Sequence, residues 1–301
     1  MDIVVCIQNI LINVLLKILE RIGCDRKLSS LDEKFIRTIL IMNLTNTKNE
    51  DIFKRFYAFK LTILILGIAI FCLATYSYLA DNLVLLCCCA VLVYFLLALM
   101  IYANYFISSQ MREILFTLTD LDKYQKYFEY AYRHAIKQDK KAGLQESYLA
   151  DAQYHYFRGE FEQSLQSLNE INIKKARWKR RKVLLTSLSY YRMLNKINQK
   201  DFSDFEDSLA LYRKMKGKHV PKSSAKLLAI YRVVSGQSTD YFERITPKYK
   251  LHRIEANYYA ALNHLNQNQP EEAKACFQEI ANENPELFYV KEAKKYLEEL
   301  V

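Results

Sequence analysis

Two uncharged apolar runs lie back to back within residues 61–101. The first run, 61–80, has twenty residues, the second, 83–101, has nineteen, and only Asp81 and Asn82 separate them. A helix needs ~20 apolar residues to cross a hydrocarbon core of ~30 Å. Neither run carries the polar stripe that marks a helix buried in a soluble protein. The sequence therefore predicts a transmembrane hairpin, and any other part of the chain must work beside a membrane.

Positive residues flank this hairpin but are absent from its connecting turn. They are Lys54, Arg55 and Lys60 before the first run and Arg112, Lys123 and Lys126 after the second. Because Lys and Arg are enriched in cytoplasmic segments, we expect a multi-pass protein of the cell membrane with both termini in the cytoplasm. The frequent use of Lys, Asn, Ile and Tyr is typical of an AT-rich bacterial genome.

The predicted hairpin occupies residues 51–110 and divides the chain into three segments. Residues 1–50 form an N-terminal amphipathic helical segment, and residues 111–301 form a cytoplasmic helical-repeat domain. Polar side chains within residues 1–22 recur at spacings of three, four or seven, so a helix would present them on one face. Such a helix either lies in the membrane interface or packs on the rest of the protein.

An all-α fold is predicted for the whole chain. The chain has only six Gly and four Pro, whereas parallel α/β folds need many Gly-bearing turns. A small residue is followed seven residues later by Gly or Asn at Ala152 and Gly159, at Ala229 and Gly236, and at Ala261 and Asn268. The long interval between Ala152 and Ala229 fits two helical pairs, with Ser189 as the missing small residue. We therefore expect four helical pairs and a cap.

Two of these stretches resemble the tetratricopeptide repeat (TPR) pattern. The matching residues are Ala152, Gly159, Phe161, Ser164 and Leu168, and then Ala261, Asn268, Ala273, Phe277 and Pro285. The pattern departs from the family at Pro270, where an aromatic residue is usual, and at Ala176, where a closing proline is usual. The resemblance implies a TPR-like α-solenoid of about four pairs, with a concave face that binds peptides or other proteins.

Catalytic motifs are missing from the sequence. It has no Gly-rich phosphate loop, no His-Glu-x-x-His, no Gly-x-Ser-x-Gly and no paired-Cys metal site. His155 and His264 each lie three residues after a small Ala, a repetition that packing explains better than metal ligation. We therefore expect no enzyme activity, no cofactor and no metal.

Charge is the informative polar feature. Between Lys174 and Arg232 there are seventeen Lys or Arg residues and four acids, a local net charge of +13. By contrast, the end of the chain, from Glu271 onward, is acidic. The candidate partner-binding residues, called the basic patch, are Lys174, Lys175, Arg177, Trp178, Lys179, Arg180, Arg181, Lys182, Arg213, Lys214, Lys216, Lys218 and Lys222. Such a patch favours an anionic partner.

The leading functional hypothesis is a membrane-anchored adaptor that presents a protein- or peptide-binding surface to an acidic partner. One alternative is an accessory subunit of a membrane transport or secretion complex. Another is binding of anionic lipid headgroups or nucleic acid through residues 174–232. Nucleic acid is the least favoured partner because few aromatic residues lie among the basic ones. The oligomeric state and the identity of the partner stay open.

Overall fold

The computed structural model describes residues 47–299, apart from a few side chains. The side chains left out are those of Tyr102, Asn104, Phe106, Gln138 and Lys179. The amphipathic helix expected in residues 1–22 lies outside the described residues. Within them, every regular element is a helix and there is no strand. The chain divides into an N-terminal unit, Met1–Ser108, and a C-terminal unit, Ser109–Val301.

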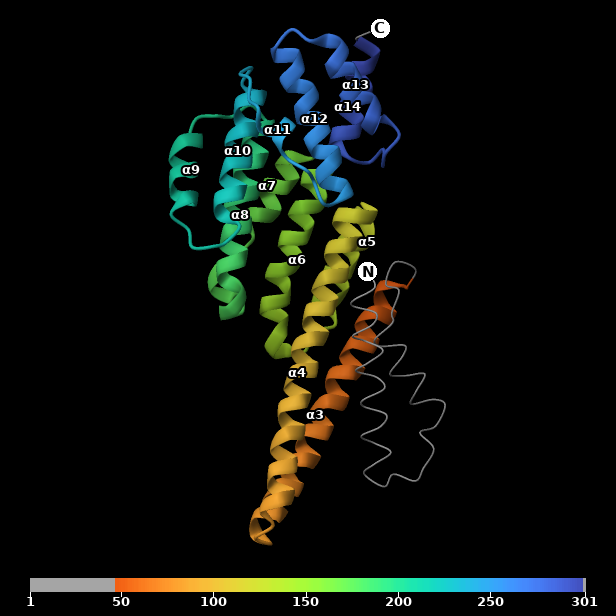
Figure 1. Ribbon diagram of the computed structural model, residues 1–301, viewed down its shortest axis with the longest axis vertical. Coiled ribbons are helices and arrows are strands. Elements are labelled where there is room, and N and C mark those ends of the chain that lie inside the picture. The colour runs from red at the N-terminus through yellow and green to blue at the C-terminus, as the bar shows by residue number, and fades with distance from the viewer. Residues whose placement is uncertain (1–46, 300–301) are drawn as a thin grey trace. The chain divides into compact units, whose positions relative to one another are not determined.

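The N-terminal unit contains the predicted hairpin. Helix α3 (Asn49–Leu79) and helix α4 (Leu83–Glu113) are joined by a tight turn (Figure 1). Asp81 adopts a left-handed conformation there, with φ of 49°. The Asn82 side chain accepts a hydrogen bond of 3.0 Å from the backbone N–H of Leu85, which caps the start of α4. These two polar residues therefore end one helix and begin the next.

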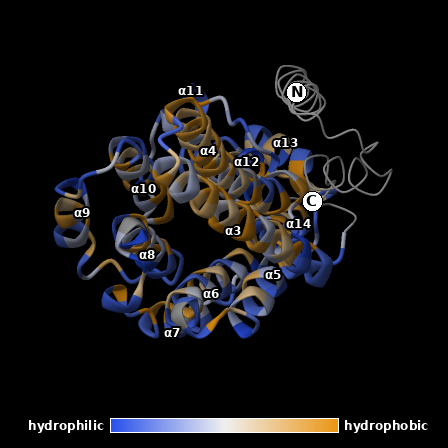
Figure 2. Ribbon diagram, turned by 90° about the horizontal axis from the view of Figure 1, so that it is seen from below, coloured by the Kyte–Doolittle hydropathy of each residue, from blue (hydrophilic) through white to orange (hydrophobic). Residues whose placement is uncertain are grey.

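Apolar side chains of α3 and α4 are mostly exposed. Phe71 is 67% exposed, Val91 68% and Tyr94 77%. Figure 2 shows the hydrophobic colour along both helices. The core helix of a soluble protein would bury these groups, because exposed apolar surface costs about 25 cal/mol per Å² in water. Both helices have the length and composition to cross a membrane.

The C-terminal unit is built from helices joined by short connections. They are the π-helix η1 (Ile114–Leu118), α5 (Leu121–Arg133), α6 (Lys137–Arg158), α7 (Phe161–Asn169), the 3₁₀ turn η2 (Ile173–Lys175), α8 (Trp178–Asn198), α9 (Phe205–Arg213), α10 (Val220–Val234), α11 (Tyr241–Arg244), α12 (Lys250–Asn266), α13 (Pro270–Ala281) and α14 (Phe288–Glu299). A single hydrophobic core extends from Leu115 to Ala293.

Four of these helices end in the same turn. The left-handed residues are Gly159, Lys200, Gly236 and Asn268, with φ of 82°, 60°, 85° and 59°. In each turn the next residue donates its N–H to a carbonyl five residues earlier: Glu160 to His155, Asp201 to Lys196, Gln237 to Arg232, and Gln269 to His264. This is the Schellman arrangement, which satisfies carbonyls that the helix end leaves free. The predicted turns at Gly159, Gly236 and Asn268 are present.

The prediction of Ser189 as the missing small residue was wrong. Ser189 is not the residue that precedes the second turn by seven, because α8 continues to Asn198 and the left-handed residue is Lys200. The equivalent position is Met193, which is buried like Ala152, Ala229 and Ala261. A lysine in a left-handed turn leaves no mark in the sequence, since Gly and Asn are the usual residues there.

The repeat residues of the last helical pair lie in the hydrophobic core, whereas the proline that follows this pair lies outside the core. Ala273 and Phe277 are fully buried, and the Phe277 ring stacks on Tyr296 with centroids 5.0 Å apart. Helix α13 ends at Ala281, so Pro285 follows in the connection to α14 and does not itself stop the helix.

The helical array of the C-terminal unit closes on itself. Helices α6, α8, α10 and α12 pack consecutively, and α14 contacts both α12 and α6. The Tyr156 and Tyr289 hydroxyls, from α6 and α14, lie 3.1 Å apart in the core. The Tyr259 hydroxyl of α12 donates to the Asn198 side chain of α8 over 3.0 Å. In an open solenoid each repeat touches only its neighbours, so this contact between the first pair and the final helix is a departure from that arrangement.

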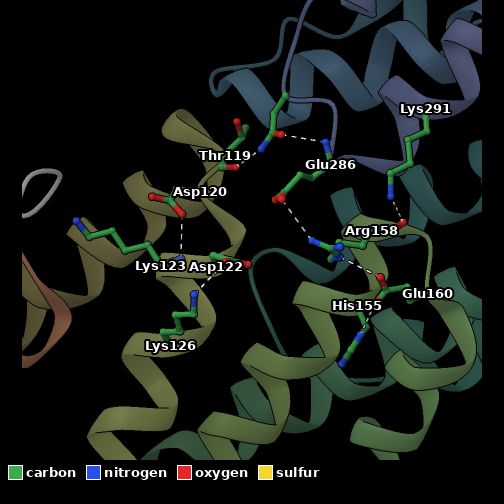
Figure 3. Close-up of polar contacts among 11 residues, drawn as sticks. Thr119, Asp120, Asp122, Lys123, Lys126, His155, Arg158, Glu160, Glu286 and Lys291 are labelled. Carbon is green, nitrogen blue, oxygen red and sulfur yellow. Dashed lines mark hydrogen bonds and ion pairs between the residues drawn. The ribbon is translucent and has the colours of Figure 1, made fainter.

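Polar contacts join α6 to the chain around α14 (Figure 3). Arg158 donates to Glu160 over 3.0 Å and forms an ion pair of 3.5 Å with Glu286. Lys291 donates to the backbone carbonyl of Arg158 over 3.1 Å. Burial would raise the pKa of Glu160, but hydrogen bonds from His155 and Arg158 outweigh burial and hold that pKa below its usual value. The Glu160 carboxylate is therefore charged at the contact between α6 and the chain around α14.

A second contact fixes the start of the unit to its end. The Asn284 side chain donates to the backbone carbonyl of Thr119 over 2.8 Å. Thr119 is buried and left-handed, with φ of 58°, where the π-helix η1 ends. The π-helix itself packs on α12. The residues that follow α4 are thus part of the packed array.

Candidate functional site

Three arginines of the basic patch hold the fold together. Arg177 pairs with Asp139 over 2.6 Å, and Arg180 makes a bidentate contact with Glu146 over 3.0 and 2.8 Å. Both acids lie on α6, so these pairs fix the start of α8 to that helix. Arg181 donates to two backbone carbonyls in the turn that precedes α8. Binding experiments that reverse these charges would also disturb the fold.

The other basic side chains of the patch point to solvent. Those that are exposed and form no ion pair with any described residue are Lys174, Lys175, Lys182, Arg213, Lys214, Lys216, Lys218 and Lys222. We call these eight the open cations. They lie on η2, α8, α9 and the chain up to the start of α10, elements that pack consecutively. The side chain of Lys179 is outside the described set.

Exposed apolar side chains accompany the open cations. Trp178 is 75% exposed at the first residue of α8, and Leu185, seven residues later on the same helix face, is 41% exposed. Leu211 of α9 is 62% exposed. Apolar groups among positive charges form a surface that suits an acidic partner with apolar residues of its own.

A cavity of about 560 Å³ lies inside the array, and the sequence did not predict it. Its wall comes from η1, α6, α8, α9, α10, α12 and the connection that contains α11. The wall is rich in tyrosine, and we call it the tyrosine cavity: Tyr156, Tyr190, Tyr191, Tyr212, Tyr241 and Tyr249 line it. These residues share no spacing in the sequence, so only the abundance of tyrosine, 23 of 301 residues, pointed to such a wall.

Charged groups also line the tyrosine cavity. Lys226 forms an ion pair with Glu255, whose side chain is only 4% exposed. Lys222 and Lys248 reach the same cavity, and neither forms an ion pair with another described residue. Lys222 is the only basic-patch residue among the lining residues. With three lysines and one glutamate, the wall carries a surplus of two positive charges when its histidines are neutral.

His252 lies between the aromatic and the charged parts of this wall. Its ring centroid is 4.8 Å from that of Phe116 and 5.7 Å from that of Tyr249. Burial lowers the pKa of His252 from its usual 6.5, and the nearby charges of Lys226 and Lys222 lower it further, against the opposing effect of Glu255. His252 is therefore neutral in the folded protein near neutral pH.

The C-terminal unit is expected to lose stability in mild acid because of His252. Its pKa is lower in the folded than in the unfolded chain, so the unfolded chain binds the extra proton first as the pH falls below 6.5. The stabilisation is complete above pH 6.5 and disappears as the pH falls through the folded pKa. Thermal unfolding followed by circular dichroism between about pH 5 and 8 measures this loss. A His252→Phe variant should show a smaller slope, and an unchanged slope would contradict this assignment.

Metal chemistry finds no support among the described side chains. No group of three His, Cys, Asp or Glu residues within residues 47–299 is arranged to hold a metal ion. His155 and His264 make equivalent hydrogen bonds in two turns. Each bonds to the side chain of the residue that immediately precedes the next helix, His155 to Glu160 over 2.6 Å and His264 to Gln269 over 2.7 Å. Their repetition in the sequence reflects turn structure.

Comparisons of the chain with protein-family models, with curated proteins and with solved structures found no match. The resemblance to tetratricopeptide repeats therefore rests on the residue pattern alone. The open cations and the tyrosine cavity are the two features of the C-terminal unit from which a function can be inferred.

Proposed function

We propose that this protein is a membrane-anchored adaptor. Its hairpin crosses the cell membrane with both termini in the cytoplasm, and its C-terminal unit binds an acidic segment of a partner protein. The open cations carry this proposal: eight exposed positive side chains without an acidic partner among the described residues lie on consecutive elements. The role is one of binding, without catalysis.

The charge distribution supports a partner-binding surface over a basic face that only contacts solvent. Surface lysines on a monomer are commonly interspersed with acids, whereas residues 174–232 hold seventeen basic residues and four acids. Exposed Trp178 adds the type of side chain that often dominates binding energy at protein interfaces. Such a surface attracts acidic partners over distances of about 10 Å, and salt weakens that attraction.

We also propose that the four helical pairs are a TPR-like solenoid that has closed. The four Schellman turns support a repeated unit. Their spacings are 41, 36 and 32 residues, whereas tetratricopeptide repeats have a period of about 34 residues. The contact of α14 with α6 replaces the open end of a solenoid.

Capture of the partner is expected to weaken when three open cations are neutralised. The test variant is Lys175→Gln/Lys182→Gln/Lys214→Gln, and the matched control removes three positive charges elsewhere through Lys200→Gln/Arg232→Gln/Lys294→Gln. Each lost ion pair should cost about 0.2–1 kcal/mol, so affinity should fall about 3- to 150-fold in the test variant. Affinity for the protein captured from solubilised membranes is the measurement. Equal affinities of the two variants would contradict the adaptor role.

The alternative role, as an accessory subunit of a transport or secretion complex, depends on the hairpin itself. The exposed apolar faces of α3 and α4 are the observation in its favour, because another protein's helices can pack on them. Exchange of residues 61–101 for an unrelated hairpin distinguishes the two roles. Retained partner capture supports the adaptor, and its loss supports the accessory subunit.

A further inference from the structure

We propose that the tyrosine cavity binds a small organic anion made of an aromatic ring and a phosphate monoester, the chemical class of a nucleoside monophosphate. This inference goes beyond the adaptor role, since the cavity lies inside the array and shares only Lys222 with the open cations. It gives the adaptor a ligand site distinct from the surface that meets a protein partner.

The size and walls of the cavity suit a small molecule. A volume of about 560 Å³ lies within the range of about 300–1,000 Å³ that is typical of small-ligand sites. Rings from three separate elements, those of Phe116, Tyr190 and His252, line it. Aromatic faces stack on flat rings at about 1–3 kcal/mol per base. The wall therefore favours a ligand with an aromatic ring.

The charge of the wall specifies the other half of the ligand. Glu255 already neutralises one lysine, Lys226, so Lys222 and Lys248 remain for a ligand. Their two positive charges match a phosphate monoester, which carries about −1.5 to −2 at neutral pH. A single carboxylate would leave one of these charges unbalanced. Both Lys222 and Lys248 line the cavity, and Lys222 lies near enough to His252 to lower the pKa of that histidine.

The start of α12 and the Tyr190 hydroxyl are further candidate hydrogen-bond donors for a phosphate. Helix α12 begins at the cavity, and Tyr249, the residue before its first turn, makes no side-chain capping bond to its backbone N–H groups. An uncapped helix start attracts phosphate. The Tyr190 hydroxyl makes no hydrogen bond to another described residue, and burial raises its pKa well above the usual value, so it stays protonated as a donor. In the proposed complex these lysines, the start of α12 and the Tyr190 hydroxyl hold the phosphate, and the aromatic wall holds the ring.

Equilibrium dialysis on the full chain in detergent micelles tests this site. The probes are the four common nucleoside monophosphates, the matching nucleosides without phosphate, inorganic phosphate and an acidic peptide. We expect at least one monophosphate to bind more tightly than its nucleoside and more tightly than inorganic phosphate. Absence of such binding at millimolar concentration, or displacement of a bound monophosphate by the acidic peptide, would overturn the proposal.

Variants assign that binding to the cavity. Lys222→Gln and Lys248→Gln should each weaken monophosphate binding about ten-fold or more, since each removes a charge-assisted hydrogen bond. Both lysines are exposed and without an ion pair among the described residues, so the fold should tolerate the change. Lys216→Gln, outside the cavity, is the control and should bind as the unaltered chain does. Equal weakening in all three variants would contradict the site.

Separate variants should affect monophosphate binding at the cavity and partner capture at the adaptor surface. The variant with Lys175, Lys182 and Lys214 changed to Gln should keep monophosphate binding, because none of these residues lines the cavity. Conversely, Tyr190→Phe should weaken monophosphate binding and leave capture of the protein partner unchanged. A loss of both activities in either variant would show that the two sites are not distinct.

Discussion

Substitution of Gly159 by Ala is expected to destabilise the C-terminal unit by about 2–5 kcal/mol, and the same change at Gly236 by only about 1–2 kcal/mol. Both glycines are left-handed, with φ of 82° and 85°, so the Cβ of an alanine would be strained at either position. At Gly159 the new Cβ would also lie 2.9 Å from a ring carbon of Phe288, whereas at Gly236 nothing lies within 4 Å. The difference between the two variants therefore measures the contact between the first helical pair and the final helix.

Chemical denaturation followed by circular dichroism gives the two free energies of unfolding. Gly159 lies at the end of α6 and Phe288 at the start of α14, so a large excess loss at Gly159 is the expected sign of a closed array. Equal losses in the two variants would show that α14 does not pack on this turn. A Phe288→Ala change combined with Gly159→Ala should remove the excess, because the clashing ring is gone.

Arginines at the centres of the two predicted spans are expected to prevent membrane insertion. The variant Phe71→Arg/Val91→Arg should lose about 5–7 kcal/mol of insertion free energy, since each central Arg costs about 2.5–3.5 kcal/mol. Both side chains are exposed, at 67% and 68%, so the change removes little packing within the chain. Resistance to alkaline extraction from membranes is the measurement, and it should fall strongly.

The matched control places the same residues at the ends of the spans. Arginine side chains at Leu61 and Ile101 can reach the polar headgroups, so Leu61→Arg/Ile101→Arg should stay in the membrane. These positions lie on the side that we assign to the cytoplasm, where positive charge agrees with the proposed orientation. If both variants resist extraction equally, α3 and α4 do not cross the bilayer.

Features encoded locally could be predicted from the sequence. The hairpin was recognisable from two uncharged runs, and α3 ends and α4 begins within a residue of the predicted limits, at Leu79 and Leu83. Turns at Gly159, Gly236 and Asn268 were recognisable because few residues accept a left-handed conformation. In each case a few neighbouring residues determine the structure, so no distant contact is needed to predict it.

Features that depend on distant contacts could not be predicted. The contact of Tyr156 with Tyr289 joins residues 133 positions apart, and nothing in either stretch marks its partner. The basic patch was visible as composition, but the acids that hold Arg177 and Arg180 lie on α6, more than thirty residues earlier. The tyrosine cavity forms only when η1, α8, α10 and α12 come together.

The central claim is that the open cations of a membrane-anchored unit meet an acidic protein. Photo-cross-linking on intact membranes, with a photoreactive amino acid in place of Trp178, tests it most directly, because this side chain is 75% exposed among those cations. We expect cross-links to a protein at an acidic segment, lost in the Lys175→Gln/Lys182→Gln/Lys214→Gln background and kept in the Lys200→Gln/Arg232→Gln/Lys294→Gln background. Cross-links to lipid or nucleic acid alone, or protein cross-links equal in both backgrounds, would contradict it.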